Sequence, residues 1–312
     1  MIEIVLFGGL GLAAVWVVLI LTVPARCGQF VYDVLTGLES RIYGLKQIQV
    51  DIGEMKISLY QNEFSDRATI MMLHGFSADK DVWIRFARHF TDDFNVVIPD
   101  LAGHGDTGFE PSWDYTMPAQ ASRVAKIIEQ LKIEKIHVIG NSMGGFISAH
   151  FARLFPRQTL SVTLVDPAGV VSPEASDMDK MLLEERNPFL IHNRQEFDSF
   201  YAMTMANPPY VPDLVLEAVF AKYQQRREQL GHIFGHVRER DLLGSSLNEI
   251  NGPVLLLWGE EDRLIHVSAA DIWATGIKDT QVKVWPGIGH MPMLEIPMES
   301  AEVYRQFIDQ IE

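Results

Sequence analysis

From residue 46 onward, apolar positions alternate between two patterns along the chain. Short, mostly apolar runs predict buried strands, and stretches with an apolar residue every three or four positions predict amphipathic helices. Buried strands that alternate with helices are typical of a mostly parallel sheet with helices on both faces. The predicted strands are a hairpin over 48–59 and single strands over 69–73, 95–99, 135–140, 160–165, 254–258 and 281–285, with helices between them over stretches such as 119–131 and 146–155.

The alternation stops between residues 172 and 247, where no strand-like run is found. Because this stretch falls between two predicted strands, we expect a helical cap over the carboxyl edge of the sheet, where open α/β sheets bind ligands. The expected division is a first core part over 46–171, a cap or lid over 172–247 and a second core part over 248–312. Apart from the breaker Asn207-Pro208-Pro209, the cap is rich in aromatic and methionine residues: Met178, Met181, Phe189, Phe197, Phe200, Tyr201, Met203, Met205, Tyr210, Phe220, Tyr223 and Phe234.

Residues 4–23 form a run of twenty residues without a charge. As a helix, such a run spans about 30 Å, the thickness of the hydrocarbon core of a bilayer. A cleaved signal peptide has a basic start and small residues at its cleavage site, whereas Glu3 precedes this run and Pro24-Ala25-Arg26 follows it. We therefore predict an uncleaved single-pass membrane anchor rather than a removed signal peptide.

Apolar residues at helical spacing continue beyond the anchor, so residues 1–45 are expected to comprise a transmembrane helix and a juxtamembrane helix. The juxtamembrane helix lies either at the bilayer surface or in the core of the soluble body, and the sequence leaves both open. The apolar positions are Phe30, Val34, Leu38, Ile42 and Leu45.

The membrane side and the oligomeric state are weakly specified by the same segment. Arg26 and Arg41 follow the predicted span, which favours the cytoplasmic face by the positive-inside rule and leaves the periplasmic face open. Gly9 and Ala13 form a small-xxx-small pair, so a homodimer through the N-terminal helix is a hypothesis.

Composition excludes several classes of protein. With 26 basic and 41 acidic residues among 312, the chain has a net charge of −15, which argues against a nucleic-acid-binding protein. A hydrophobic fraction of 47% excludes intrinsic disorder. Cys27 is the single cysteine, so no internal disulfide forms, and we expect it to be unmodified. The sequence holds neither an H-E-x-x-H motif nor paired cysteines, so we expect no metal and no cofactor.

The most informative string is Gly140-Asn141-Ser142-Met143-Gly144, a G-x-S-x-G motif between a predicted strand and a predicted helix. In this context the serine occupies a tight, strained turn that exposes its hydroxyl, and flanking glycines let neighbouring backbone approach. Ser142 is therefore the candidate nucleophile. The alternative is an ordinary glycine-rich turn with a capping serine.

A serine hydroxyl needs a base, and the base needs an orienting acid, in the chain order serine, acid, histidine for this motif. His290 follows the last predicted strand in a glycine-rich loop and is the favoured base, whereas His266 is expected to be structural. Asp262, in the loop after the strand over 254–258, is the favoured acid. Asp166 is its rival, and Glu261 is a weaker alternative.

A second string, Leu73-His74-Gly75-Phe76, ends an early predicted strand. The backbone amides of Phe76 and Met143 are expected to form an oxyanion hole, in which two fixed donors stabilise developing negative charge. His74 and His104 are expected to hold loops rather than to act in catalysis.

These motifs resemble those of the α/β-hydrolase superfamily over residues 46–312. Within it, the chain is similar to membrane-anchored monoacylglycerol lipases of the abhydrolase-domain type and to bacterial lipases and phospholipases A. That resemblance implies Ser142, Asp262 and His290 as nucleophile, acid and base, with oxyanion amides at Phe76 and Met143. It is carried by residues 72–83, Ser142-Met143-Gly144-Gly145, Asp166-Pro167-Ala168-Gly169, Trp258-Gly259-x-x-Asp262, Gly289-His290, Glu295, Pro297 and the N-terminal span.

The expected function is a membrane-anchored serine carboxylic-ester hydrolase that acts on lipids, of the monoacylglycerol lipase, lysophospholipase or phospholipase A type. Asn141 and the string Ser-Met-Gly-Gly also occur in the C–C bond hydrolases of aromatic catabolism, so hydrolysis of a soluble dienone is an alternative. A second alternative is a non-catalytic ligand-binding protein on a hydrolase fold.

Overall fold

The computed structural model describes residues 23–237 and 242–311. Within them, one eight-stranded sheet has the order β1-β2-β4-β3-β5-β6-β7-β8. The first two strands and β4 pair antiparallel in turn, and the strands from β3 to β8 run parallel. The mostly parallel sheet predicted from the apolar runs is thus confirmed. The strands are β1 (Lys46–Asp51), β2 (Lys56–Gln61), β3 (Thr69–Leu73), β4 (Asn95–Pro99), β5 (Ile136–Asn141), β6 (Thr159–Val165), β7 (Val254–Gly259) and β8 (Thr280–Trp285).

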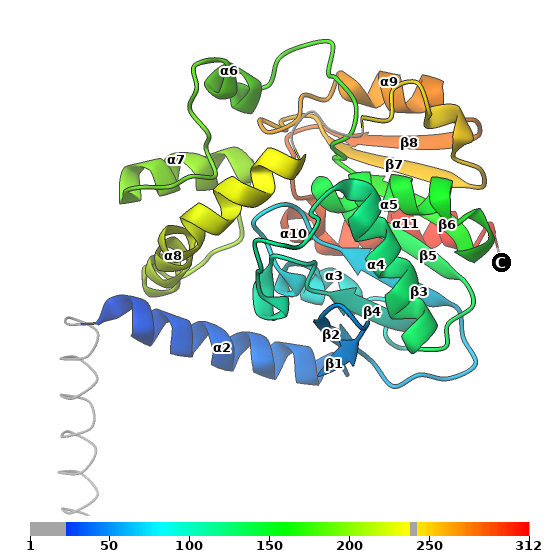
Figure 1. Cartoon of the computed structure of the whole chain (residues 1–312), viewed down its shortest axis with the longest axis horizontal. Coiled ribbons are helices and arrows are strands. Elements are labelled where there is room, and N and C mark those ends of the chain that lie inside the picture. Colours follow the sequence, from blue (N-terminus) through cyan, green and yellow to red (C-terminus); the bar gives the residue numbers. More distant parts are fainter. Residues whose placement is uncertain (1–22, 238–241, 312) are drawn as a thin grey trace, which may run out of the picture.

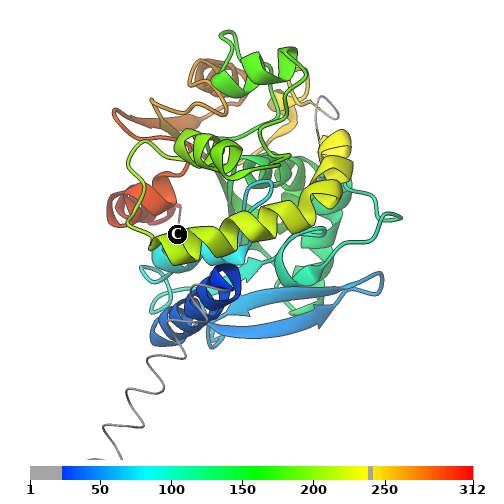
Figure 2. The same ribbon diagram turned by 90° about the vertical axis from the view of Figure 1, so that its left-hand side faces the viewer.

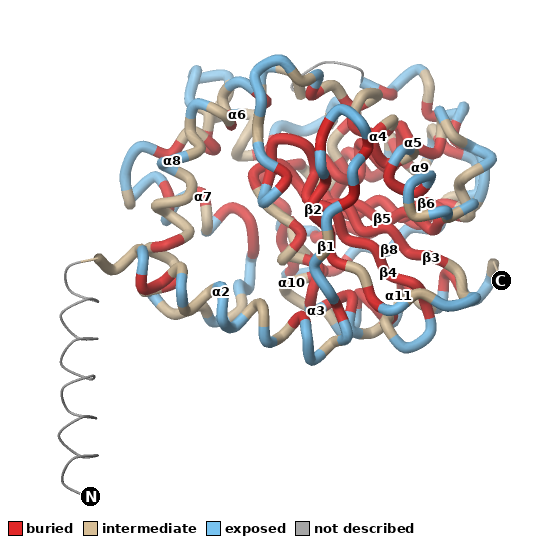
Figure 3. The backbone as a smooth tube through the Cα atoms, turned by 60° about the horizontal axis from the view of Figure 1, so that its bottom comes forward, coloured by how far each residue is buried: buried red, intermediate tan, exposed pale blue. Residues whose placement is uncertain are grey.

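The central strands β3, β4 and β5 are buried along their whole length because helices cover both faces of the sheet (Figures 1 and 3). Successive side chains of β5 point to opposite faces, with Val138 in one core cluster and Ile139 in the other. One cluster includes α4 (Met117–Gln130), α5 (Met143–Leu154) and α9 (Ala269–Gly276). The other includes α3 (Ile84–Ala87), α10 (Pro292–Glu295) and α11 (Pro297–Ile308).

Among the described residues, three α-helices follow the carboxyl end of β6 and precede β7: α6 (Asp177–Leu183), α7 (Arg194–Thr204) and α8 (Asp213–Val237). Polar caps fix the starts of the first two. Ser176 and Asp179 form a capping box at α6, and the Asn193 side chain accepts the Glu196 amide at α7. These helices fall within the stretch in which the sequence predicts a cap.

Helix α2 (Pro24–Ile42) packs against α8 beside the body of the protein (Figures 1 and 2). The two helices approach each other closely at Gly28, where an added Cβ would lie 1.8 Å from the Leu214 carbonyl oxygen, so only glycine allows this approach. Leu45 is buried. The other predicted apolar positions, Phe30, Val34, Leu38 and Ile42, are exposed by 49–69%, which excludes a core helix for that face.

Across residues 23–237 and 242–311, the structure contains no helix that is both long and apolar enough to cross a membrane. The predicted span over 4–23 lies outside the described residues except for Val23.

Candidate active site

Ser142 sits between the last residue of β5 and the first residue of α5. Its backbone has φ 57° and ψ −118°, a strained conformation that a non-glycine residue adopts only where the surroundings enforce it. An added Cβ at Gly140 would lie 2.1 Å from the Gly144 carbonyl oxygen, and one at Gly144 would lie 2.2 Å from that of Leu73. The glycines of the motif are therefore needed for the turn, as the sequence predicts.

His290 and Asp262 form a buried pair beside this turn. The Nδ1 atom of His290 lies 2.6 Å from Oδ2 of Asp262, and each residue is 4% exposed. The other carboxylate oxygen of Asp262 accepts the amides of Leu264 (2.8 Å) and Ile265 (3.0 Å), which fixes the carboxyl group in place. With Nδ1 donating to Asp262, Nε2 of His290 is left free to accept a proton. Ser142 and His290 line the same pocket.

The loop that carries His290, called the histidine loop below, is held from both sides. The backbone amide of His290 donates to the Thr204 carbonyl at the end of α7 (3.2 Å), and its carbonyl accepts Nδ2 of Asn141 (2.9 Å). Glu295 accepts the amide of Gly289 (2.8 Å). Sequence reasoning missed these roles of Asn141 and Thr204. The position of Asn141 beside the nucleophile was the available signal, whereas Thr204 carries none.

The two predicted oxyanion donors lie at the same edge of the sheet. Phe76 follows β3 and Met143 begins α5, and neither backbone amide donates a hydrogen bond to a described residue. An added Cβ at Gly75 would lie 3.2 Å from the Ser142 Cβ, so the chain after β3 passes directly beside the candidate nucleophile. Two unpaired amides beside the serine suit the binding of an oxyanion. Their role stays a prediction.

The remaining predicted histidines have structural contacts. His74 is fully buried, donates Nδ1–H to the Gly75 carbonyl (2.8 Å) and accepts the Leu101 amide at Nε2 (3.0 Å). Burial lowers the pKa of His74 and, more strongly, that of His104, which favours neutral imidazoles. His266 contacts the Ser268 hydroxyl at 3.0 Å. These contacts fit loop-holding residues.

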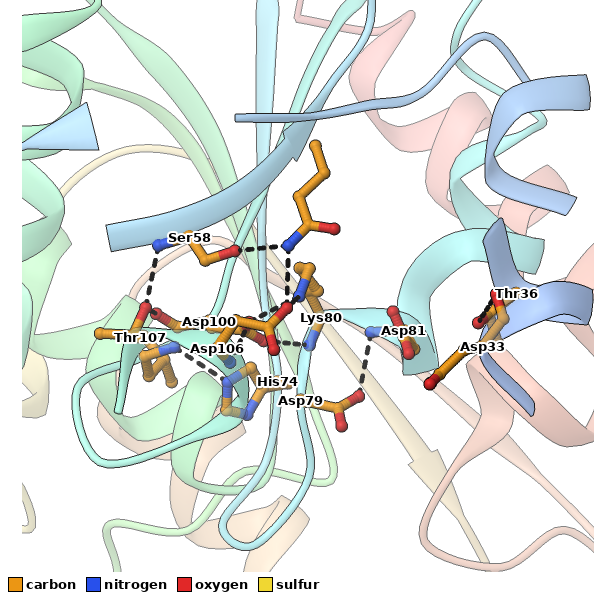
Figure 4. A network of polar contacts seen from close by, with 12 residues as sticks. Asp33, Thr36, Ser58, His74, Asp79, Lys80, Asp81, Asp100, Asp106 and Thr107 are labelled. Carbon is orange, nitrogen blue, oxygen red and sulfur yellow. Dashed lines mark hydrogen bonds and ion pairs between the residues drawn. The ribbon is translucent and has the colours of Figure 1, made fainter. Parts of the chain in front are cut away.

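A buried ionic network fixes the loop after β3 (Figure 4). The Lys80 ammonium lies 2.7 Å from Asp100 and 2.8 Å from Asp106, while the Lys80 amide donates to the other Asp100 oxygen. Burial alone would lower the pKa of Lys80, yet the two carboxylates raise it overall. Burial raises the pKa of Asp100. Because Lys80 begins the short 3-10 helix η1 (Lys80–Trp83), the network anchors the segment that carries the Phe76 amide.

The pocket that contains Ser142 and His290 is a cavity of about 200 Å³ and is mainly apolar. It adjoins a polar cavity of about 460 Å³ under α2, and both are lined by Tyr32, Asp79, Lys222 and Arg226. The predicted cap supplies much of the apolar wall, namely Phe189, Phe197, Phe200, Tyr201, Met205 and Val219. The space beside the serine is therefore mainly apolar, and the space next to it is polar.

Three side chains at this edge of the sheet, one of them the proposed base, are of types that can bind a metal ion. Oxygen or nitrogen atoms of Asp166, Asp262 and His290 lie within 4.8 Å of one another. The hydrogen bond between His290 and Asp262, at 2.6 Å, accounts for two of these groups without a metal. The absence of a metal stays an expectation.

Comparisons with known proteins agree with this geometry. The model of the alpha/beta hydrolase fold family matches residues 68–297. Lipase 1 of Psychrobacter immobilis is 32% identical over 245 residues, which are 76% of each chain. Monoacylglycerol lipase abhd6-A of Xenopus laevis is 27% identical over 259 residues, which are 79% of this chain and 77% of its own. A crystal structure of a membrane phospholipase A, a bacterial virulence factor, is 31% identical, with a TM-score of 0.88 over 99% of both chains. These similarities confirm the resemblance indicated by the sequence motifs.

Proposed function

The chain belongs to the alpha/beta hydrolase fold family, and on this basis we propose that it is a membrane-anchored serine hydrolase of lipid esters. One observation carries the proposal: His290, which pairs with the buried Asp262 at 2.6 Å, lines an apolar pocket that Ser142 also lines. The lipase and phospholipase relatives support an ester of a lipid as the substrate.

The proposed reaction begins when Ser142 Oγ attacks the acyl carbonyl as Nε2 of His290 takes the hydroxyl proton. Asp262 holds the imidazole and stabilises its positive charge. The amides of Phe76 and Met143 bind the oxyanion, and the imidazolium then gives its proton to the departing alcohol oxygen. Water, activated by His290, hydrolyses the acyl-enzyme and restores the serine.

The cavities beside Ser142 support a substrate with one long apolar chain and a polar head. The apolar pocket suits an acyl chain, because its aromatic and methionine side chains present adaptable apolar surface. The adjoining polar cavity is lined by charged, amide and hydroxyl groups. Monoacylglycerols and lysophospholipids have these two parts, and phospholipids carry a second acyl chain in addition. We assign residues 172–247 as the cap that closes this pocket.

Membrane attachment is also part of the proposal. The anchor over 4–23 would place α2 at the bilayer, and the exposed apolar residues Phe30, Leu35 and Leu38 of α2 suit an interfacial position. Both the cytoplasmic and the periplasmic face remain compatible with this arrangement. Pairing of two anchors through Gly9 and Ala13 stays a hypothesis.

The test uses detergent-solubilised full-length protein. A fluorophosphonate probe is expected to label the wild type and Ser245→Ala, a control at an exposed serine, but not Ser142→Ala. The wild type and Ser245→Ala are expected to hydrolyse a panel of monoacylglycerols, lysophospholipids and phospholipids, whereas Ser142→Ala is not. Labelling that persists in Ser142→Ala would contradict the nucleophile assignment.

The same panel separates the two alternatives. Preferential cleavage of a dienone over every lipid ester would favour the C–C bond hydrolase. A folded wild type that turns over no substrate and binds no probe would favour a ligand-binding role.

A further inference from the structure

Asp166 is a buried acid that the proposed reaction does not use. It follows directly on β6, is fully buried and has a positive φ of 45°. Its amide donates to the Leu257 carbonyl (2.9 Å), and its Oδ1 accepts the Gly259 amide (2.8 Å). Both of these partners belong to β7, so the carboxyl is fixed in place between two neighbouring strand ends.

The carboxyl group of Asp166 lies close to the proposed base and its acid. Side-chain atoms of Asp166, Asp262 and His290 lie within 4.8 Å of one another. Within the described residues, Oδ2 of Asp166 has no hydrogen-bond donor. A buried carboxylate oxygen without a donor is costly, whereas a protonated carboxyl next to an acceptor satisfies both groups.

The hydrogen bonds indicate which carboxyl carries a proton. Asp262 accepts two amides and the His290 ring, whereas Asp166 accepts one amide. Two adjacent carboxyl groups do not both ionise readily. Burial, and then the charges of Asp262 and Glu295, raise the pKa of Asp166 well above its ordinary value.

We propose that Asp166 is a positioning residue, whose neutral carboxyl donates a hydrogen bond from Oδ2 to the Asp262 carboxylate. This inference rests on the proposed role of Asp262 and His290. The bond orients Asp262 toward the imidazole, and the neutral state keeps a second negative charge away from His290. A metal ion fits less well, because ligand atoms around a cation at about 2.1 Å lie roughly 3 Å apart, farther than the 2.6 Å between His290 and Asp262.

The central comparison is between Asp166→Asn and Asp166→Ala in the full-length protein. Asparagine can accept the Gly259 amide through its oxygen and donate to Asp262 through its nitrogen, so it mimics the neutral acid. We expect Asp166→Asn to retain kcat within about threefold. Asp166→Ala is expected to lower kcat about 10- to 100-fold with little change in KM. A loss of that size in kcat corresponds to the free energy of one hydrogen bond to a charged group.

The pH profile tests the protonation state of Asp166 in the working enzyme. If Asp166 is neutral in the working enzyme, the acid limb of kcat/KM for Asp166→Asn coincides with that of the wild type. If Asp166 is ionised, the asparagine removes a negative charge near His290, lowers the pKa of the imidazole and moves the acid limb to lower pH by about one unit. That shift, or a fully active Asp166→Ala, would overturn the inference.

Infrared spectroscopy tests the protonation state without any turnover. The difference spectrum of wild type minus Asp166→Asn at mildly alkaline pH is expected to contain a protonated carboxylic acid band. A carboxylate band in its place overturns the inference even if the lipase function is correct. Conversely, a protonated band in a protein that cleaves no ester contradicts the proposed function alone.

Discussion

Asn141 provides the sharpest test of how the site is held together. Its side chain, 1% exposed, donates to the carbonyls of His290 (2.9 Å) and Val165 (3.2 Å). The Val165 carbonyl also accepts the Ser142 amide, whereas the His290 carbonyl has no other donor among the described residues. Asn141→Ala therefore removes two hydrogen bonds and leaves one buried carbonyl unpaired.

The expected loss follows from these contacts. Two hydrogen bonds of about 1 kcal/mol each and an unpaired buried carbonyl of about 1–3 kcal/mol give a fall of roughly 3–5 kcal/mol in the free energy of unfolding. Because the bond positions the histidine loop, a displacement of His290 by about 1 Å would lower kcat/KM by up to about 100-fold. Urea unfolding followed by tryptophan fluorescence, together with ester hydrolysis, measures both effects.

Asn141→Asp gives the same test a dependence on pH. The introduced carboxyl faces two carbonyl oxygens, so its pKa is raised in the folded protein above the unfolded value of about 3.9. Between the pKa of the unfolded chain and the higher pKa of the folded protein, the folded state binds more protons than the unfolded chain. The variant therefore loses stability relative to wild type as pH rises above about 4. Asn141→Ala shows no such trend. Asn251, an exposed asparagine, supplies the matched controls Asn251→Ala and Asn251→Asp.

If Asn141→Ala equals Asn251→Ala in both stability and kcat/KM, the proposed support of the histidine loop by Asn141 is wrong. If Asn141→Ala loses stability but retains kcat/KM, the side chain supports the fold without positioning His290.

Three further predictions concern the surroundings of the site. Lys80→Met leaves Asp100 and Asp106 without their buried cation, so urea unfolding is expected to show a loss of about 3–5 kcal/mol; an unchanged midpoint would contradict the network. Burial raises the pKa of Asp81 to about 7, so the folded protein keeps a proton that the unfolded chain releases near pH 4. The free energy of unfolding should therefore fall as pH rises from about 4 to 7, and a titration of Asp81→Asn should lack this component. Val219→Trp, which places an indole in the pocket wall, is expected to lower kcat/KM for long acyl esters about tenfold relative to short ones. An equal loss of kcat/KM for long and short esters would mean that the acyl chain of the substrate binds elsewhere.

The sequence predicted the fold well because its main signals are local. Short apolar runs correspond to β3, β4, β5 and β7, in which every residue is buried because helices cover both faces of the sheet. The strained turn at Ser142 was also predictable, because the glycines that it requires are its neighbours in the sequence.

Contacts between distant residues could not be predicted in the same way. The bond between Asn141 and His290 joins residues 149 positions apart, and its existence depends on where two loops meet. The rival acids Asp166 and Asp262 illustrate the same limit. Each follows a strand and is buried at the same edge of the sheet, but only Asp262 contacts the His290 ring. Chain order alone could not exclude Asp166.

The bonds around His290 also connect the helices between β6 and β7 to the chemistry. The His290 amide is bonded to Thr204 at the end of α7, while its ring is bonded to Asp262 in the core. The backbone next to it is equally confined, because an added Cβ at Gly289 would lie 2.6 Å from the Ala206 nitrogen. The hydrogen bond to Asp262 therefore fixes the orientation of the imidazole, and the contacts with the end of α7 and the residues after it fix its position. We therefore expect a displacement of α7 to move the backbone of His290 before it breaks the hydrogen bond between His290 and Asp262. Movement of these helices on substrate binding would then change kcat and not KM alone.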